Sequence, residues 1–209
     1  MRTTAILPVK SFAQAKQRLS GGLEPDLRRR LAEAMLQDVL EALNASAIDD
    51  VIVVASADAV AALAADAGAR VLRDQAQGHN AAAALGAREA LRAGAGRALF
   101  VPGDCPALDA AELDELIGRP ATVPSVMIVP DRHGTGTNAL LITPPDAMTP
   151  SFGPGSCQRH AALAGGAGLL HEVVAVPSLA LDIDTVEDLA ALAELPDRGL
   201  RTHELLARC

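Results

Sequence analysis

Residues 98–117 read ALFVPGDCPALDAAELDELI, and this stretch decides the fold. An apolar run over Ala98–Val101 predicts a strand that the following Pro, Gly and Asp bring to an end. Asp109 then stands where a helix N-cap belongs, ahead of a helix over Ala110–Ile117. A strand followed directly by a helix is half of a βαβ unit. Asp104 is therefore expected at a strand end, where open α/β sheets bind ligands.

The same alternation of strand and helix continues in both directions along the chain. The other expected strands are Thr3–Val9, Val51–Ala55, Arg70–Arg73, Val126–Val129, Ala139–Ile142 and Glu172–Val176. The other expected helices begin at Pro25, with an apolar stripe to Leu43, and cover Asp58–Asp66, Asn80–Ala93, Cys157–Ala164 and Val186–Ala193, with a short packing helix in the tail. We find no repeat and no linker, so residues 1–209 are expected to form a single α/β domain with a mostly parallel sheet.

The amino-acid composition argues against nucleic acid and anionic lipid as binding partners. The formal net charge is −8, and the chain has no Trp, no Tyr and three Phe. Nucleic acid and anionic lipid both require clustered cations, and single-stranded nucleic acid also requires stacking aromatics. No apolar run is long enough for a signal peptide or a membrane span. Three widely spaced cysteines fit a reducing compartment. We expect a cytoplasmic protein that binds small molecules.

Three aspartates follow predicted strands. Magnesium prefers one or two carboxylates together with phosphate oxygens, which suits Asp104. Asp182 and Asp184 form a D-x-D in a segment expected to be extended, where alternation places both on one side. Two close carboxylates repel each other unless a cation lies between them. An Asx turn at Asp104 and a helix N-cap at Asp184 or Thr185 are the competing interpretations.

Three cations follow the first strand. Lys10, Lys16 and Arg18 could neutralise a triphosphate and a departing pyrophosphate. A solvated basic loop is the alternative. The G-x-x-x-x-G-K-[ST] pattern is absent, which disfavours a P-loop NTPase.

Two further polar loops suit an anionic ligand. Residues 131–138, DRHGTGTN, offer hydroxyls and backbone donors, although they also fit a simple hairpin turn. Residues 151–160, SFGPGSCQRH, precede a helix whose N-terminal N–H groups would favour a phosphate or carboxylate. Ser156 as a plain N-cap is the competing interpretation.

Taken together, seven stretches resemble the family of 2-phospho-L-lactate and phosphoenolpyruvate guanylyltransferases, which act in biosynthesis of the deazaflavin coenzyme F(420). The matching stretches are LPVK, AKQRL, GHNAA, VPGDCPAL, DRHGTGTNALL, SFGPGSCQRH and LDIDTVEDL, and they span nearly the whole chain in order. The resemblance implies a single-domain nucleotidyltransferase fold, a GT-A-like three-layer sandwich.

The resemblance also implies roles for individual residues. Asp104, Asp182 and Asp184 would bind Mg²⁺, and Lys10, Lys16 and Arg18 would face GTP as the catalytic cations. Thr137, Gly153 and Ser156 would grip a small phosphorylated carboxylic acid. Asn80 would lie near the guanosine, with Asp104 also touching the nucleotide. Gly155 stands where members of the family often carry an acidic residue, which leaves acceptor preference open.

The implied reaction moves GMP from GTP to the phosphate of the acid and releases pyrophosphate. Phosphoenolpyruvate is the preferred acceptor, with 2-phospho-L-lactate and 3-phospho-D-glycerate as the other options. A molybdopterin- or sugar-phosphate nucleotidyltransferase is an alternative, but its usual L-A-G-G loop is absent. A catalytically inactive GTP-sensing domain is a second alternative function. Oligomeric state stays open, with a homodimer as one option.

Overall fold

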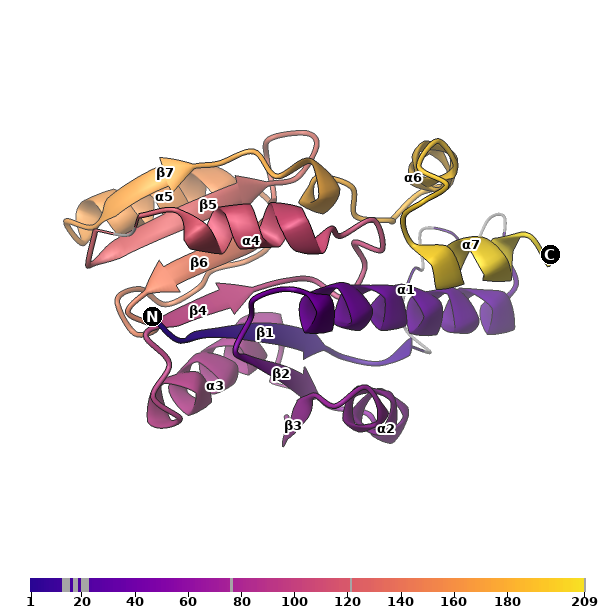
Figure 1. Cartoon of the computed structure of the whole chain (residues 1–209), viewed down its shortest axis with the longest axis horizontal. Helices are drawn as coiled ribbons and strands as arrows, with labels where there is room; N and C mark the ends of the chain where they lie inside the picture. Colours follow the sequence, from indigo (N-terminus) through magenta and orange to yellow (C-terminus); the bar gives the residue numbers. More distant parts are fainter. Residues whose placement is uncertain (13–15, 17–18, 20–22, 76, 121, 209) are drawn as a thin grey trace.

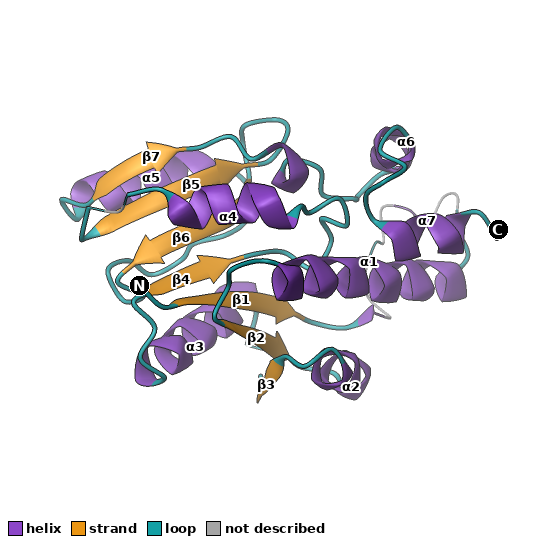
Figure 2. Cartoon of the chain, in the orientation of Figure 1, coloured by secondary structure: helices purple, strands orange, loops and turns teal. Residues whose placement is uncertain are grey.

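A seven-stranded sheet runs through the chain (Figures 1 and 2). This computed structural model describes residues 1–12, 16, 19, 23–75, 77–120 and 122–208. The strands, in the order β3-β2-β1-β4-β6-β5-β7 across the sheet, are β1 Thr3–Val9, β2 Asp50–Ala55, β3 Arg70–Arg73, β4 Arg97–Phe100, β5 Ser125–Pro130, β6 Thr137–Thr143 and β7 Leu170–Val173.

Strand direction places several chain segments at one edge. β1 pairs in parallel with both β2 and β4, and β5 pairs in parallel with β7. β6 is antiparallel to its neighbours β4 and β5. The amino end of β6 therefore meets the carboxyl ends of β1 and β4. The expected mostly parallel sheet is confirmed.

Helices cover both faces of the sheet, which makes three layers. α3 (His79–Arg92) and α5 (Ser156–Gly166) share one apolar core with the sheet. The opposite core holds α1 (Pro25–Ala45), α2 (Asp58–Asp66), α4 (Ala110–Gly118), α6 (Val186–Ala193) and α7 (Leu200–Leu206). Figure 1 shows α1, α4 and α7 on the near face, with α3 and α5 behind. Among the described residues no helix is long and apolar enough to cross a membrane.

The alternation of side chains along β1 builds both cores at once. Ala5 and Leu7 join the core under α1, whereas Ile6 joins the core over α3. α3 comes close to Ile6 because Gly86 has no side chain. A Cβ at Gly86 would lie 2.4 Å from Cγ2 of Ile6. Close packing of this kind ties the helix that starts at His79 firmly to the central strand.

Most expected boundaries hold within one or two residues, and β7 is the exception. We expected a strand over Glu172–Val176, but the strand is Leu170–Val173. It ends earlier because the chain leaves the β5 edge after the bond from Val174 N to Ile128 O and enters a short 3-10 turn, Pro177–Leu179. The N-cap predicted at Asp109 is confirmed, since its carboxylate accepts from Glu112 N.

A buried carboxylate of α1 holds the carboxyl-terminal helix α7. Asp38 is 7% exposed, and its Oδ1 accepts from Arg201 N at 3.0 Å. Its Oδ2 accepts from Thr202 N at 3.0 Å and Thr202 Oγ1 at 2.6 Å. Asp38 therefore caps the amino end of α7 from another helix.

Asp38→Ala is expected to lower the free energy of unfolding by about 2 to 4 kcal/mol, because it leaves two backbone donors and a hydroxyl without their acceptor. The melting temperature should fall by about 5 to 15 °C, measured by calorimetry. Glu41→Ala is the matched control, since it removes only the exposed Glu41–Arg201 ion pair between the same helices. Equal losses in both variants would contradict the capping role.

Candidate active site

The carboxyl ends of β1 and β4 open into a cleft of about 460 Å³. Such an edge is where open α/β sheets bind ligands, and the volume is within the usual range of small-molecule sites. Its lining combines Pro102 and Gly103 after β4, apolar residues of α1, and four polar residues, Lys10, Lys16, His79 and Asp104.

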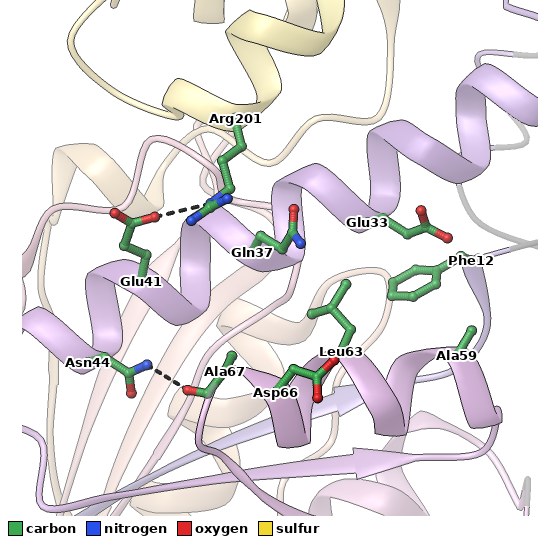
Figure 3. A pocket seen from close by; sticks show the side chains of 10 residues that line it. All are labelled: Phe12, Glu33, Gln37, Glu41, Asn44, Ala59, Leu63, Asp66, Ala67 and Arg201. Atoms are coloured by element: carbon green, nitrogen blue, oxygen red, sulfur yellow. Dashed lines mark hydrogen bonds and ion pairs between the residues drawn. The ribbon is translucent and has the colours of Figure 1, made fainter.

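A second hollow, of about 550 Å³, lies between α1 and α2 (Figure 3). Figure 3 shows Glu33 and Glu41 of α1, Asp66 of α2 and Arg201 around it. Three carboxylates against one guanidinium would repel a polyphosphate. The cleft at the sheet edge is therefore the better site for a nucleotide.

Lys16 joins two of the three predicted site aspartates. Its Nζ lies 2.6 Å from Oδ2 of Asp104 and 3.0 Å from Oδ1 of Asp184. Burial alone would lower the pKa of the Lys16 ammonium, but the charges of Asp104 and Asp184 together raise it above its ordinary value. The Lys16 ammonium therefore already places a positive charge between the carboxylates of Asp104 and Asp184.

Burial alternates along the D-x-D segment as predicted. Ile183 is fully buried and its N–H donates to the carbonyl of Asp104, while the flanking aspartates remain half-buried. Thr185 is the N-cap of α6 and forms a capping box with Asp188. The interpretation of Asp184 as that N-cap is therefore wrong.

Asp182 carries the clearest sign of crowded negative charge. Burial raises the pKa of its carboxyl, and the charges of Asp104 and Asp184 add to this shift. The hydrogen bond from Asn138 Nδ2, at 3.1 Å, acts in the opposite direction. The three predicted aspartates are therefore close enough to influence one another.

These carboxylates fit a magnesium ion that arrives with a nucleotide. Within the described part of the chain, no three Asp, Glu, His or Cys side chains form a ready-made metal cage. Mg²⁺ does not require one, because it usually combines one or two carboxylates with phosphate oxygens and water. Two carboxylates that already share a cation, with a third alongside, match this donor set.

Residues 131–136 form an ordered loop around Asp131. Its carboxylate accepts from the N–H groups of His133, Thr135 and Gly136. A Cβ at Gly136 would lie 2.6 Å from Oδ2 of Asp131, so glycine is required at this approach. The expectation that these backbone donors cradle a ligand anion is wrong for these three, because they turn inward to Asp131.

A β-bulge at the start of β6 sets the directions in which the Thr137 and Asn138 side chains point. Val129 of β5 pairs with Ala139, but the following residue, Pro130, pairs with Thr137. Asn138 is the extra residue. Its amide donates to Leu179 O at 2.7 Å and to Asp182 on one side of the sheet, whereas Thr137 faces α5 on the other.

The predicted acceptor residues gather at the amino end of α5. Thr137 Oγ1 lies 3.0 Å from Nδ1 of His160, which is one helical turn beyond Ser156. The carbonyl of Gly153 accepts from Ser156 N. Gly155 is the N-cap residue and Ser156 the first residue of α5, so the plain N-cap interpretation of Ser156 is wrong.

The amino terminus of α5 offers fewer free donors than expected. Ser156 N donates to Gly153 O and Cys157 N donates to Thr135 O, so both are already used within the protein. Neither of these two N–H groups is therefore free to bind an anion.

Asn80 ties α3 to the loop before α5. Its Oδ1 accepts from Phe152 N at 2.7 Å, and its Nδ2 donates to Phe152 O at 3.2 Å. The ring of Phe152 lies edge-on to both His79 and His160, with centroids 5.2 Å apart in each pair. A contact of Asn80 with guanosine stays a prediction.

The structure describes two of the three basic residues that were expected to face the triphosphate, Lys10 and Lys16. Lys10 follows β1 and lines the cleft, and its charge joins burial in lowering the pKa of His79. Arg18 lies outside the described residues.

Sequence reasoning missed the roles of Asn138 and His160. Both stand inside stretches that were singled out, but neither was assigned a role. The spacing of four between Ser156 and His160 places them on one helix face, and this was the available signal. Asn138 could not be found in this way, because its direction depends on the bulge.

Comparison with known proteins identifies the relatives of this chain. A family model described as guanylyl transferase CofC like matches residues 3–207. A phosphoenolpyruvate guanylyltransferase from Conexibacter woesei is 52% identical over 198 residues, which cover 93% of this chain and 89% of that protein. A 3-phospho-D-glycerate guanylyltransferase from Phenylobacterium zucineum is 39% identical over 208 residues, covering 97% and 94%.

A solved structure supports the fold independently. A putative nucleotide-diphospho-sugar transferase from Desulfovibrio desulfuricans G20 superposes with a TM-score of 0.75, covering 100% of this chain and 95% of that one. The two share 18% sequence identity, so this likeness speaks for the fold alone. The expected nucleotidyltransferase sandwich is confirmed.

Proposed function

Because the chain belongs to the family of CofC-like guanylyl transferases, we propose that it transfers GMP from GTP to the phosphate of a small phosphorylated carboxylic acid, with phosphoenolpyruvate as the preferred acceptor. The relative from Conexibacter woesei, named for phosphoenolpyruvate, supports this choice. The product would enter deazaflavin coenzyme biosynthesis.

One observation carries the proposal: Asn138 connects two differently built halves of the site. On one side, Asp182 accepts from Asn138 and lies near Asp104, Asp184 and the cation of Lys16. On the other, the neighbouring Thr137 belongs to the polar group at α5. A carboxylate-rich half suits a metal-bound triphosphate and a hydroxyl-bearing half suits an acidic acceptor.

The proposed reaction needs no protein nucleophile. An acceptor phosphate oxygen attacks the α-phosphorus of GTP, a new P–O bond forms, and the bond to the β-phosphate breaks with loss of pyrophosphate. A phosphate dianion is already deprotonated near pH 7, so the chain has to position the two substrates and balance charge. In this scheme Lys10 and Lys16 would face the triphosphate, and Thr137 and Ser156 would hold the acid.

Asp104, Asp182 and Asp184 would hold Mg²⁺ in this scheme. When bound, the ion would neutralise charge on the phosphate oxygens during transfer.

The test is to incubate the protein with GTP, Mg²⁺ and, separately, phosphoenolpyruvate, 2-phospho-L-lactate and 3-phospho-D-glycerate, and to measure pyrophosphate. We expect acceptor-dependent release, fastest with phosphoenolpyruvate. Reactions without acceptor, or with ATP or CTP replacing GTP, are the controls. No release with any acid would refute the proposed activity and favour a GTP-sensing domain.

A further inference from the structure

We propose that His160 is a positioning residue that makes the Thr137 hydroxyl a hydrogen-bond donor toward the acidic acceptor. The proposal rests on the proposed function for the identity of the acceptor. His160 is fully buried and therefore acts through Thr137, which is half-buried and borders a small cavity beside Phe152 and Pro102.

The hydrogen bonds of His160 define which ring nitrogen carries the proton. The backbone N–H of Ser151 donates to Nε2 at 2.9 Å. A backbone amide is always a donor, so Nε2 has to be the unprotonated nitrogen. In a neutral ring the proton then lies on Nδ1, the atom 3.0 Å from Thr137 Oγ1.

This tautomer determines the direction of the Thr137 proton. Because Nδ1–H donates to Oγ1, the hydroxyl uses one lone pair as an acceptor and its own proton points elsewhere. The opposite tautomer would accept that proton and leave Thr137 without a donor for the ligand. A donor is what an anionic phosphate or carboxylate oxygen requires.

The surroundings of His160 keep its ring neutral. Burial, followed by the positive charge of Arg159, lowers the pKa of His160 to about 4. Arg159 itself is held by Ser151 O, Ser151 Oγ and Pro154 O, so the charge next to the ring is fixed in place. The ring is therefore neutral near pH 7, and Thr137 would remain a donor at the pH at which the acid is fully ionised.

Two substitutions separate the two hydrogen bonds of the ring. An asparagine amide reaches about as far as Nδ1, so His160→Asn preserves a donor for Thr137. A glutamine amide reaches about as far as Nε2, so His160→Gln preserves an acceptor for Ser151 N and loses the donor. Thr137→Val removes the hydroxyl while retaining the shape of the side chain.

We expect His160→Gln to raise the KM for the acid about 10-fold, with kcat and the KM for GTP within about 2-fold of wild type. His160→Asn should recover most of this loss. In a Thr137→Val background, His160→Gln should add almost nothing, because its target is gone. Additive effects in the double variant, or an equal rise in the KM for GTP, would overturn the proposal.

A second measurement does not depend on catalysis. Long-range ¹⁵N–¹H NMR spectra of the wild-type imidazoles, with His160→Gln used for assignment, should show Nδ1 protonated and Nε2 bare at pH 7. The opposite tautomer, or an imidazolium, would overturn the inference even if all three acids are turned over. Absence of turnover with the expected tautomer would instead count against the proposed function alone.

Discussion

Asp182→Asn is expected to reduce pyrophosphate release by about 1,000-fold or more, because it removes a carboxylate from the proposed metal site. The fold should remain intact, since an asparagine oxygen still accepts from Asn138. The measurements are kcat at saturating Mg²⁺ and the Mg²⁺ concentration that gives half-maximal rate. Asp104→Asn should behave in the same way.

The stability of the Asp182 variant has a predictable sign. Burial and neighbouring charges raise the pKa of Asp182, so the folded state binds its proton more tightly than the unfolded state does. Stability therefore falls as pH rises from the unfolded pKa through the raised folded one. Above the raised folded pKa that cost is present in full, and there Asp182→Asn should leave the melting temperature unchanged or raise it.

Asp197→Asn at an exposed position is the control with the same change in charge. It should retain wild-type turnover. Near-wild-type turnover of the Asp182 variant at all Mg²⁺ concentrations would refute its assignment as a ligand.

Lys16→Met is the second large effect, with an expected loss of about 100-fold or more in kcat/KM for GTP. It should also lower the free energy of unfolding by about 1 to 3 kcal/mol without Mg²⁺, because Asp104 and Asp184 lose the cation between them. The raised pKa of Lys16 means that this stabilisation is complete below its unfolded pKa near 10 and is lost only as pH rises above it.

Magnesium should partly replace the missing ammonium. In Lys16→Met the ion would bind without competition from a lysine, so millimolar Mg²⁺ should raise the melting temperature more than it does in wild type. Arg88→Met, which removes an exposed positive charge, should show the wild-type response. A smaller or equal Mg²⁺ effect in the Lys16 variant would argue against a shared cation site.

The sheet could be predicted from sequence because its strands are short β-branched runs bounded by Gly, Pro and Asp. β7 was misplaced because its apolar run, which continues to Val176, extends past the point where the chain leaves its neighbour. Periodicity reports hydrophobic character, and it does not report where pairing stops. Capping at Asp109 and Thr185 was readable because it depends on residues three positions apart.

The sequence predicted some of the polar side chains that meet at the sheet edge, such as the three aspartates, but it did not predict the contacts that they make. Asp182 and Asp184 were found from spacing alone. The contact of Lys16 with Asp104 joins positions 88 residues apart, and no local pattern encodes it. The backbone N–H groups that donate to Asp131 could not be distinguished, from the sequence alone, from N–H groups that face a ligand.

The bulge at Asn138 has a consequence for how this protein could diversify. Strict alternation would turn Thr137 to the same face as Ala139, away from α5. The extra residue instead turns Asn138 toward Asp182 and Thr137 toward α5, so substitutions around α5 can alter one side of the sheet while the aspartates stay untouched. Relatives named for phosphoenolpyruvate and for 3-phospho-D-glycerate both match nearly the whole chain, and independent evolution of the proposed acceptor half would produce such a pair.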